Sequence, residues 1–285
     1  MDYLKMFAEM ISFRGLTAHT LKVYSSYLRF YLDYLKNELK KDPNDVTWEE
    51  LRTFVNWLQK SRGLSDRSIN CCIAQLHFFT TYVLHKPWDS TQLPTRKFDT
   101  FLPYVPSQEE VHRFISTIPD LKVKAMVSLL YSSGLRVGEV CHLQYENVSR
   151  KNMTIHILHS KNRSDRYACL SEHALQILTQ YWYTHGKPKA WLFPKQRDPS
   201  KPIDPFYLSR NITLHEQRLG WPHRLTCHSF RHAFGTHLYQ NGTDLLTIKA
   251  LLGHKSIRST TIYVHLAESL GYAVSNPFDA LKEET

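Results

Sequence analysis

Four prolines between residues 87 and 106 constrain this chain most, because no regular helix runs through them. They are Pro87, Pro94, Pro103 and Pro106. Proline lacks the backbone N–H donor of a helix and disfavours helical geometry in the residue before it, so such a stretch is typical of a connection between folded units. A chain of 285 residues is long enough for two domains with separate cores. We therefore expect one domain at residues 1–88, a basic proline-containing linker at residues 89–106 and a second domain at residues 107–285.

The segment before the prolines has the apolar spacing of amphipathic helices. Between residues 17 and 39, leucine and tyrosine recur at helical spacing and form one face. The stretch TWEELRTFVNWLQ starts at Thr47 and has Glu50 three residues later, a pair whose side chains satisfy free backbone donors at a helix start. Another helix begins near Ser65. Residues 1–88 are therefore expected to form a four-helix module.

The segment after the prolines combines helices with one short β-hairpin. Residues 153–158, MTIHIL, and residues 166–170, RYACL, have the β-branched or alternating composition of strands, and the polar HSKNRSD between them predicts a basic hairpin tip. Helices are expected from Ser107, at residues 121–132, 171–185, 204–218, 228–241 and 243–252, and around Tyr263. The predicted fold class is thus mainly α, with two domains and a small antiparallel sheet in the second.

The charge and the apolar content indicate a class of partner and a compartment. The formal net charge is +10, and both halves of the chain carry a surplus of lysine and arginine. This balance favours a polyanion such as nucleic acid, although a basic surface also serves solubility alone. No apolar run approaches the roughly 20 residues of a membrane helix, and the N-terminus lacks the pattern of a signal peptide. The five cysteines show no CxxC spacing, so we expect reduced thiols in a soluble, cytoplasmic protein.

Two histidines four residues apart, His228 and His232, have the spacing found in the zinc-binding HExxH helix. Position 229 is serine, however, where that chemistry requires a glutamate base. A single histidine in such a place would be interpreted as an ordinary core or surface residue. We therefore expect no metal site. The role of these histidines has to be inferred from the residues near them.

Arginines near these histidines predict a site for a phosphate. His228 and Arg231 are three residues apart, so on a helix their side chains share a face. Arg136 follows a small-residue turn in SSGLRVGE, where a guanidinium offers two parallel donors to the same anion. Glu139, three residues later, either orients that arginine or caps a helix. Two arginines around a phosphodiester would neutralise the charge of a pentacoordinate transition state.

Two further residues have the chemistry that cleavage of a phosphodiester requires. Tyr263 can attack phosphorus, but a free tyrosine has a pKa of about 10, so it needs proton removal and a cationic setting. The oxygen that leaves is a poor leaving group as an alkoxide and needs a general acid. Lys161, at the basic hairpin tip, is the candidate for that acid.

The set GLRVGE, the hairpin lysine, HSFRH, LLGH and TTIYVH resembles the tyrosine recombinases, also called phage-type integrases. The five elements occur in the order of that family, and His254 and Tyr263 have its close spacing. The helical N-terminal module and the basic linker resemble its SAM-like core-binding domain, so the likeness covers nearly the whole chain. The resemblance implies a catalytic domain with the DNA breaking-rejoining fold and a clamp of two domains around duplex DNA.

The resemblance also implies a role for each matching residue. Two arginines clamp the scissile phosphate, two histidines bind it and assist proton movement, a lysine protonates the leaving oxygen, and a tyrosine forms a 3′-phosphotyrosyl bond. The resemblance assigns the arginine role to Arg136 and Arg231 and the histidine role to His228 and His254. The lysine is Lys161 and the tyrosine is Tyr263, with Glu139 in support. Because the covalent bond conserves the energy for rejoining, members of the family need no ATP, cofactor or metal.

The implied partner is double-stranded DNA with paired half-sites, bound by a homotetramer with one dimer on each site. The expected location is the cytoplasm, at the nucleoid, with accessory proteins undefined. The layout resembles the minimal Xer-like and transposon-resolving recombinases, because the sequence before residue 17 has no room for an arm-binding domain. A C-terminal tail at about residues 266–285 is expected to dock on a neighbouring protomer or to pack on its own domain. Deletion of residues 275–285 should then impair assembly.

Three points stay open at this level. The lysine stands in HSKNRSD and not between glycines, so Arg163 and Arg166 leave its register undecided. The same tyrosine chemistry serves type IB topoisomerases, which relax supercoils, and a catalytically silent DNA-binding protein would retain the fold. One active site serves integration, excision and resolution alike, so these residues do not choose among them.

Overall fold

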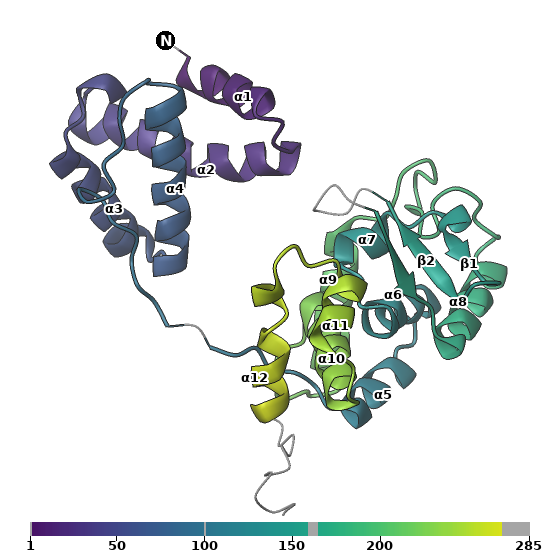
Figure 1. The fold of residues 1–285 in the computed structure, drawn as a ribbon. Helices are drawn as coiled ribbons and strands as arrows, with labels where there is room; N and C mark the ends of the chain where they lie inside the picture. Colours follow the sequence, from purple (N-terminus) through teal and green to yellow (C-terminus); the bar gives the residue numbers. More distant parts are fainter. Residues whose placement is uncertain (1, 100, 159–164, 270–285) are drawn as a thin grey trace, which may run out of the picture. The chain divides into compact units, whose positions relative to one another are not determined.

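The computed structural model describes residues 2–99, 101–158 and 165–269 and divides into two compact units, Met1–Phe101 and Leu102–Thr285. Each unit has its own hydrophobic core, and most of the described chain is helical (Figure 1). None of the described helices has both the length and the apolar character needed to cross a membrane. The predicted fold class, mainly α with a small antiparallel sheet, is confirmed.

Four α-helices build the described part of the first unit. They are α1 (Tyr3–Phe13), α2 (Ala18–Tyr34), α3 (Trp48–Arg62) and α4 (Asp66–Tyr82). The expected capping pair starts α3: the Thr47 hydroxyl accepts from the Glu50 N–H at 3.3 Å, and Glu50 Oε2 accepts from the Thr47 N–H at 2.9 Å. The helix expected to reach residue 39 ends earlier, because Leu35–Leu39 forms a π-helical turn that is closed by Lys40 in the left-handed region.

Aromatic side chains fill the interior of this unit. Phe7, Phe54 and Phe79 are fully buried and come from α1, α3 and α4. The ring of Tyr31, on α2, has its centroid 5.2 Å from that of Phe54 and 6.2 Å from that of Phe79. Tilted and edge contacts of this kind add specific geometry to hydrophobic burial. One aromatic cluster therefore joins all four helices.

The expected linker at residues 89–106 is anchored near its middle and near its C-terminal end. Asn70 on α4 donates to the Arg96 carbonyl and accepts from the Arg96 N–H, both at 2.8 Å. The Arg96 guanidinium also pairs with Asp66 at 3.1 Å. Val105, near the C-terminal end, is buried in the core of the second unit. The part of the segment around Arg96 thus belongs to the first unit, and the part around Val105 belongs to the second.

The second unit is built around a helix that is buried on nearly all sides, α6 (Leu121–Ser132). Every residue in its run 125–130 is buried, as expected for a helix in the middle of a core. Five helices pack against it. They are α5 (Gln108–Ser116), α7 (Val137–Cys141), α8 (Glu172–Thr184), α9 (Pro205–Arg218) and α10 (Cys227–Gln240).

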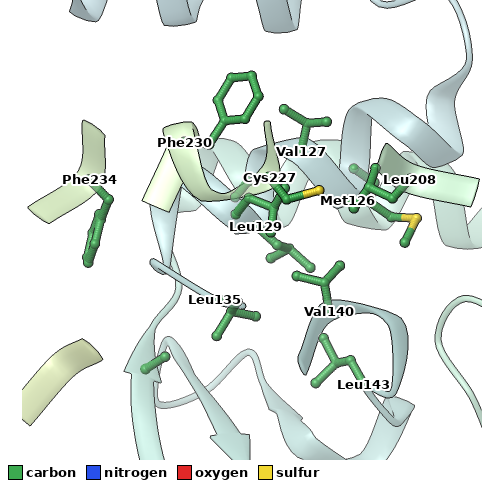
Figure 2. Close-up of a cluster of buried hydrophobic side chains, with 14 of the residues drawn as sticks. Met126, Val127, Leu129, Leu135, Val140, Leu143, Leu208, Cys227, Phe230 and Phe234 are labelled. Atoms are coloured by element: carbon green, nitrogen blue, oxygen red, sulfur yellow. The ribbon is translucent and has the colours of Figure 1, made fainter. Parts of the chain in front are cut away.

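Figure 2 shows this core where α6 meets α7, α9 and α10. Met126 of α6 and Leu208 of α9 belong to one cluster of buried side chains, and Phe230 of α10 is fully buried in the same cluster. Leu135 and Val140, on either side of the start of α7, are also fully buried. The core therefore fixes the start of α7 relative to α10.

Besides the helices α11 (Leu245–Leu252) and α12 (Ile262–Ser269), the described part of this unit contains a small sheet of three antiparallel strands. In spatial order they are β1 (Val148–Ser149), β2 (Thr154–Ile157) and β3 (Arg166–Cys169). β2 and β3 form the expected hairpin, with Ile157 opposite Arg166. β1 was not predicted, because two residues are too few to show an alternating pattern. The hairpin tip at residues 159–164, which includes Lys161, lies outside the described residues.

Candidate active site

A helix end at which three arginines meet is the centre of the candidate site. The helix α11 (Leu245–Leu252) ends where Gly253 adopts the left-handed conformation, with a φ of 63°, that glycine reaches without steric cost. Three successive carbonyls there each accept a hydrogen bond from a different arginine. The pairs are Leu251 with Arg166 Nε at 3.1 Å, Leu252 with Arg231 Nη2 at 2.6 Å, and Gly253 with Arg136 Nη2 at 3.3 Å. Carbonyls at a helix C-terminus carry partial negative charge, so they stabilise cations.

Arg136 is placed by the first turn of α7 and by Glu139. Glu139 Oε2 accepts from the Arg136 backbone N–H, and Oε1 accepts from Arg136 Nη1, both at 2.8 Å. The same carboxylate accepts two bonds from Arg166, each at 2.8 Å. Burial alone would raise the pKa of Glu139, but the bonds from Arg166 and Arg136 lower it to about 2. Glu139 therefore both caps the helix and orients Arg136, the two roles between which the sequence did not decide.

Arg231 lies in the second turn of α10 with 3% of its surface exposed. Its Nη1 donates to the Gly134 carbonyl and its Nη2 to the Leu252 carbonyl. Burial and the charge of Arg136 lower the pKa of Arg231 to about 10, so it stays protonated at neutral pH. Carbonyl partners orient a guanidinium without cancelling its charge. Arg231 therefore keeps its positive charge inside the cluster.

Tyr263 lies at the start of α12 (Ile262–Ser269), which packs against α10. The tyrosine is 1% exposed, and its ring faces Gly235, where an added Cβ would come within 2.6 Å of the ring. The ring of His254 is parallel to it within 10°, with centroids 6.1 Å apart. Burial raises the pKa of Tyr263 to about 12 against the opposing effect of two nearby guanidinium groups. The hydroxyl is thus protonated at neutral pH before any substrate binds.

His254 follows α11 directly and is held by one side-chain hydrogen bond. Its Nδ1 lies 3.0 Å from the Thr260 hydroxyl, so Nε2 is the ring nitrogen left to reach a substrate. Burial, together with the charges of Arg231 and Arg136, lowers the pKa of His254 to about 4. The imidazole is therefore neutral at physiological pH.

His232 extends the cluster of rings along α10. Its ring centroid lies 6.0 Å from that of Tyr263 and 6.2 Å from that of His228, which is exposed in the first turn of the helix. Burial, with the charges of His228 and Arg231, lowers the pKa of His232 to about 4. Within residues 2–99, 101–158 and 165–269, no three His, Cys, Asp or Glu side chains are gathered as a metal site requires.

Most of the residues singled out in the sequence lie in this one cluster. They are Arg136, Glu139, Arg231, His254 and Tyr263, with His228 at the exposed edge. Lys161 lies outside the described residues. Sequence reasoning missed Thr260, for which no signal exists, and considered Arg166 only as a rival in the register of the lysine. Arg166 acts on residues 27 and 85 positions away, a relation that local spacing does not reveal.

Comparison with known proteins decides the family. Residues 106–269 match the phage integrase family, and residues 3–90 match the phage integrase N-terminal SAM-like domain. The chain belongs to the phage integrase family. This tyrosine recombinase is 34% identical to y4qK of Sinorhizobium fredii (strain NBRC 101917 / NGR234), which carries the name integrase/recombinase, over 92% of this chain and 84% of that one. It is 30% identical to tyrosine recombinase XerD of Listeria monocytogenes serotype 4b (strain F2365) over 90% of each chain.

A solved structure supports the fold of the recombinase. The Tn1549 transposon integrase, in complex with circular intermediate DNA, aligns with a TM-score of 0.72 at 21% identity and covers 98% of each chain. The family matches and the relatives at 30% identity or more confirm the predicted resemblance to tyrosine recombinases with an Xer-like layout. The protein is a site-specific recombinase enzyme.

Replacing Gly235 with alanine is expected to displace Tyr263. Alanine in a helix interior is normally more stable than glycine by about 1 kcal/mol, but here its Cβ would overlap the tyrosine ring. We expect faster amide hydrogen exchange in α12 and a lower melting temperature. The matched control is Gly138→Ala on α7, where nothing lies within 4 Å of the added Cβ. Equal exchange in α12 for the two variants would contradict the close packing.

Acid is expected to destabilise the recombinase through His232 and His254. Their pKa values of about 4 lie below the 6.5 of an unfolded histidine, so the folded state binds fewer protons. This contribution to the free energy of unfolding is complete above pH 6.5 and is lost as the pH falls towards 4. The slope from each histidine cannot exceed about 1.4 kcal/mol per pH unit, because one histidine takes up at most one proton when the chain unfolds.

Urea unfolding between pH 4 and 7.5 measures this slope. His254→Gln and His232→Gln should each flatten it, whereas the exposed His173→Gln should not. If the wild type and the three variants have the same slope, neither His232 nor His254 is buried in its neutral form.

Proposed function

We propose that this recombinase cuts and rejoins duplex DNA through a covalent 3′-phosphotyrosyl bond to Tyr263. The observation that carries the proposal is the convergence of Arg136 and Arg231 on one helix end beside that tyrosine. A guanidinium has five N–H donors. Each of these arginines uses two nitrogens in the described hydrogen bonds, so the other donors are uncommitted among the described contacts. Two preorganised guanidinium groups with spare donors suit the oxygens of one phosphate.

The charge balance also supports a phosphodiester as the bound group. Arg136, Arg166 and Arg231 surround one carboxylate, Glu139, so the cluster has a surplus of positive charge. A pentacoordinate phosphorus carries more negative charge on its oxygens than the ground state does. Donors fixed in advance therefore stabilise the transition state more than the ground state. Loss of one such donor typically lowers the rate by a factor of about 10²–10³.

In the proposed cleavage step, the Tyr263 oxygen forms a bond to phosphorus while the bond from phosphorus to the 5′ oxygen breaks. Burial raises the pKa of Tyr263, so its proton must pass to an acceptor. His254 and His228 are proposed to bind phosphate oxygens and assist this proton movement. The pKa of His254 is lowered by burial and by arginine charges. A bound phosphate offsets those charges, so the histidine becomes a better acceptor once substrate is in place.

The leaving 5′ oxygen is proposed to take its proton from Lys161. An ammonium group is the general acid that the sequence places at the basic hairpin tip. In the rejoining step, a 5′ hydroxyl attacks the phosphorus of the phosphotyrosyl bond and gives its proton to the lysine, while the displaced tyrosine oxygen takes back its proton from the histidine. Because the phosphotyrosyl bond retains the energy of the original one, the cycle is balanced without ATP.

The proposed partner is double-stranded DNA with paired half-sites, held by a tetramer with one dimer on each site. The Tn1549 integrase was solved in complex with circular intermediate DNA, and the net charge of +10 suits a partner of this kind. A protein with this partner is proposed to work at the nucleoid, in the cytoplasm. The C-terminal tail at about residues 266–285 is proposed to link neighbouring protomers, and residues 270–285 lie outside the described residues.

Tyr263→Phe is expected to abolish covalent capture of DNA. Phenylalanine keeps the ring that packs on α10 but lacks the oxygen that attacks phosphorus. The measurement is denaturant-resistant capture of protein-bound DNA from expressing cells, followed by sequencing of the captured ends. Tyr183→Phe, at a tyrosine that is 58% exposed, should give wild-type adducts.

The products separate the possible outcomes. Adducts at one defined sequence, with rearranged DNA, support site-specific recombination. Relaxed circles alone would indicate the activity of a type IB topoisomerase. If the wild type forms no adduct at matched expression, with a native target locus present, the protein is a non-catalytic DNA-binding member of the family.

A substrate with a better leaving group tests Lys161. We expect Lys161→Ala to slow cleavage by about 10²–10⁴, the usual effect of general acid catalysis. If the bridging 5′ oxygen is replaced by sulfur, the leaving thiolate needs no proton, so the variant should cleave as fast as the wild type. Arg163→Ala is the matched control and should behave like the wild type on both substrates. A defect of Arg163→Ala that sulfur rescues would place the general acid at position 163.

A further inference from the structure

We propose that Arg166 is a positioning residue for strand cleavage, which locks Glu139 and the end of α11 so that Arg136 and His254 keep one geometry. This inference rests on the proposed function, because it concerns the same phosphate site. Arg166 is the first residue of β3, and its side chain is 8% exposed. From the sequence, Arg166 is one of two arginines that leave the position of the catalytic lysine undecided. Its contacts in the structure assign it another role.

The Arg166 guanidinium joins two segments that are distant in the sequence. Nη1 and Nη2 donate to Glu139 Oε1 and Oε2 at 2.8 Å each, the bidentate geometry that matches a guanidinium to a carboxylate. Nε donates to the Leu251 carbonyl at 3.1 Å. One side chain therefore connects β3, the first turn of α7 and the end of α11.

Glu139 passes this constraint on to Arg136 through the same two oxygens. Oε1 also accepts from Arg136 Nη1, and Oε2 also accepts from the Arg136 backbone N–H. Each carboxylate oxygen is thus shared by two arginines, and rotation of the carboxylate is blocked from both sides. Without Arg166, the carboxylate turns more freely, and Arg136 loses the rigid partner that directs its remaining donors.

The contact at Leu251 passes the constraint on to His254. The chain turns between these residues at Gly253, and Arg166 packs directly against that turn. A Cβ added at Gly253 would lie 2.7 Å from Arg166 Cδ and 3.1 Å from its Nε. The absence of a side chain at position 253 therefore makes room for the arginine that holds this turn.

Arg166 does not act as a third phosphate ligand. All three of its guanidinium nitrogens donate to protein acceptors, including both oxygens of one carboxylate, whereas Arg136 and Arg231 each use only Nη1 and Nη2 in the described hydrogen bonds. It reaches the reacting atoms only through Glu139 and the backbone of α11. Loss of Arg166 should therefore lower the rate of cleavage without lowering the affinity for DNA.

Single-turnover cleavage measures this separation. The substrate is a duplex of the sequence captured with Tyr263, nicked so that the short cleaved strand diffuses away and the adduct accumulates. We expect Arg166→Gln to cleave about 10²-fold more slowly with a DNA Kd within about twofold of wild type, because misplacement of a phosphate ligand costs rate. Arg166→Lys keeps the charge but not the bidentate pair, so it should recover part of the rate. Arg150→Gln, at an exposed arginine between β1 and β2, is the matched control.

The pH profile distinguishes positioning from a loss of folded protein. In the wild type, Glu139 stays ionised at any pH well above its pKa of about 2. In Arg166→Gln the carboxylate loses two bonds, so burial raises its pKa and cleavage should fall further at acidic pH. Arg166→Lys keeps a positive charge beside Glu139, so its cleavage rate should fall at acidic pH no more than the wild-type rate does. A loss of the same size at every pH in Arg166→Gln, or a wild-type rate in both variants, overturns the proposal.

The NMR signals of the Arg136 guanidinium give a result that does not depend on cleavage, after assignment with Arg136→Lys. We expect slowly exchanging N–H signals in the wild type and in Arg150→Gln, and broadened ones in Arg166→Gln. Unchanged signals in Arg166→Gln overturn the positioning role. If the wild type forms no adduct, the proposed function fails, and these signals still decide what Arg166 does.

Discussion

Three successive carbonyls at the end of α11 hold three arginines without neutralising them, and the rest of the site depends on this interaction. A buried cation normally needs a counter-charge, which would compete with any anionic substrate. The end of a helix supplies partial negative charge and unpaired acceptors instead. Arg231 can therefore be 3% exposed and still protonated, with a pKa of about 10. Glu139 is the one carboxylate among the described ion pairs of this cluster, and it leaves a positive surplus.

This arrangement makes the fold and the site interdependent. The arginines come from the start of α7, from β3 and from α10, and they meet at a fourth element, α11. The central helix α6 packs against α7 and α10, and the buried side chains in Figure 2 fix those two helices. A shift in the core by a fraction of an ångström would change hydrogen-bond lengths at the helix end. We infer that core substitutions near α7 and α10 affect the site before they unfold the chain.

Most helices could be predicted from the sequence. So could most of the charged and aromatic residues that the structure brings together in one cluster. Capping pairs such as Thr47 with Glu50 are local, so their spacing predicts the helix start that the structure has. The two-residue strand β1 and the π-helical end of α2 had no such pattern. Arg166 and Thr260 were missed for a different reason. Arg166 contacts a carboxylate 27 positions away and a backbone carbonyl 85 positions away, and Thr260 contacts a histidine ring. None of these partners leaves a recognisable spacing in the chain.

The burial of Tyr263 sets an order of events for any chemistry at this site. Its ring lies against Gly235 on α10 with 1% of its surface exposed, and burial raises the pKa of its hydroxyl to about 12, so the proton stays on the oxygen until an acceptor is in place. Thr260, just before α12, is bonded to His254 at 3.0 Å. This bond orients the imidazole beside the tyrosine ring, while the three arginines are held by the carbonyls at the end of α11. The arginines are thus charged and oriented beforehand, and deprotonation of the tyrosine is the step that has to wait for the substrate.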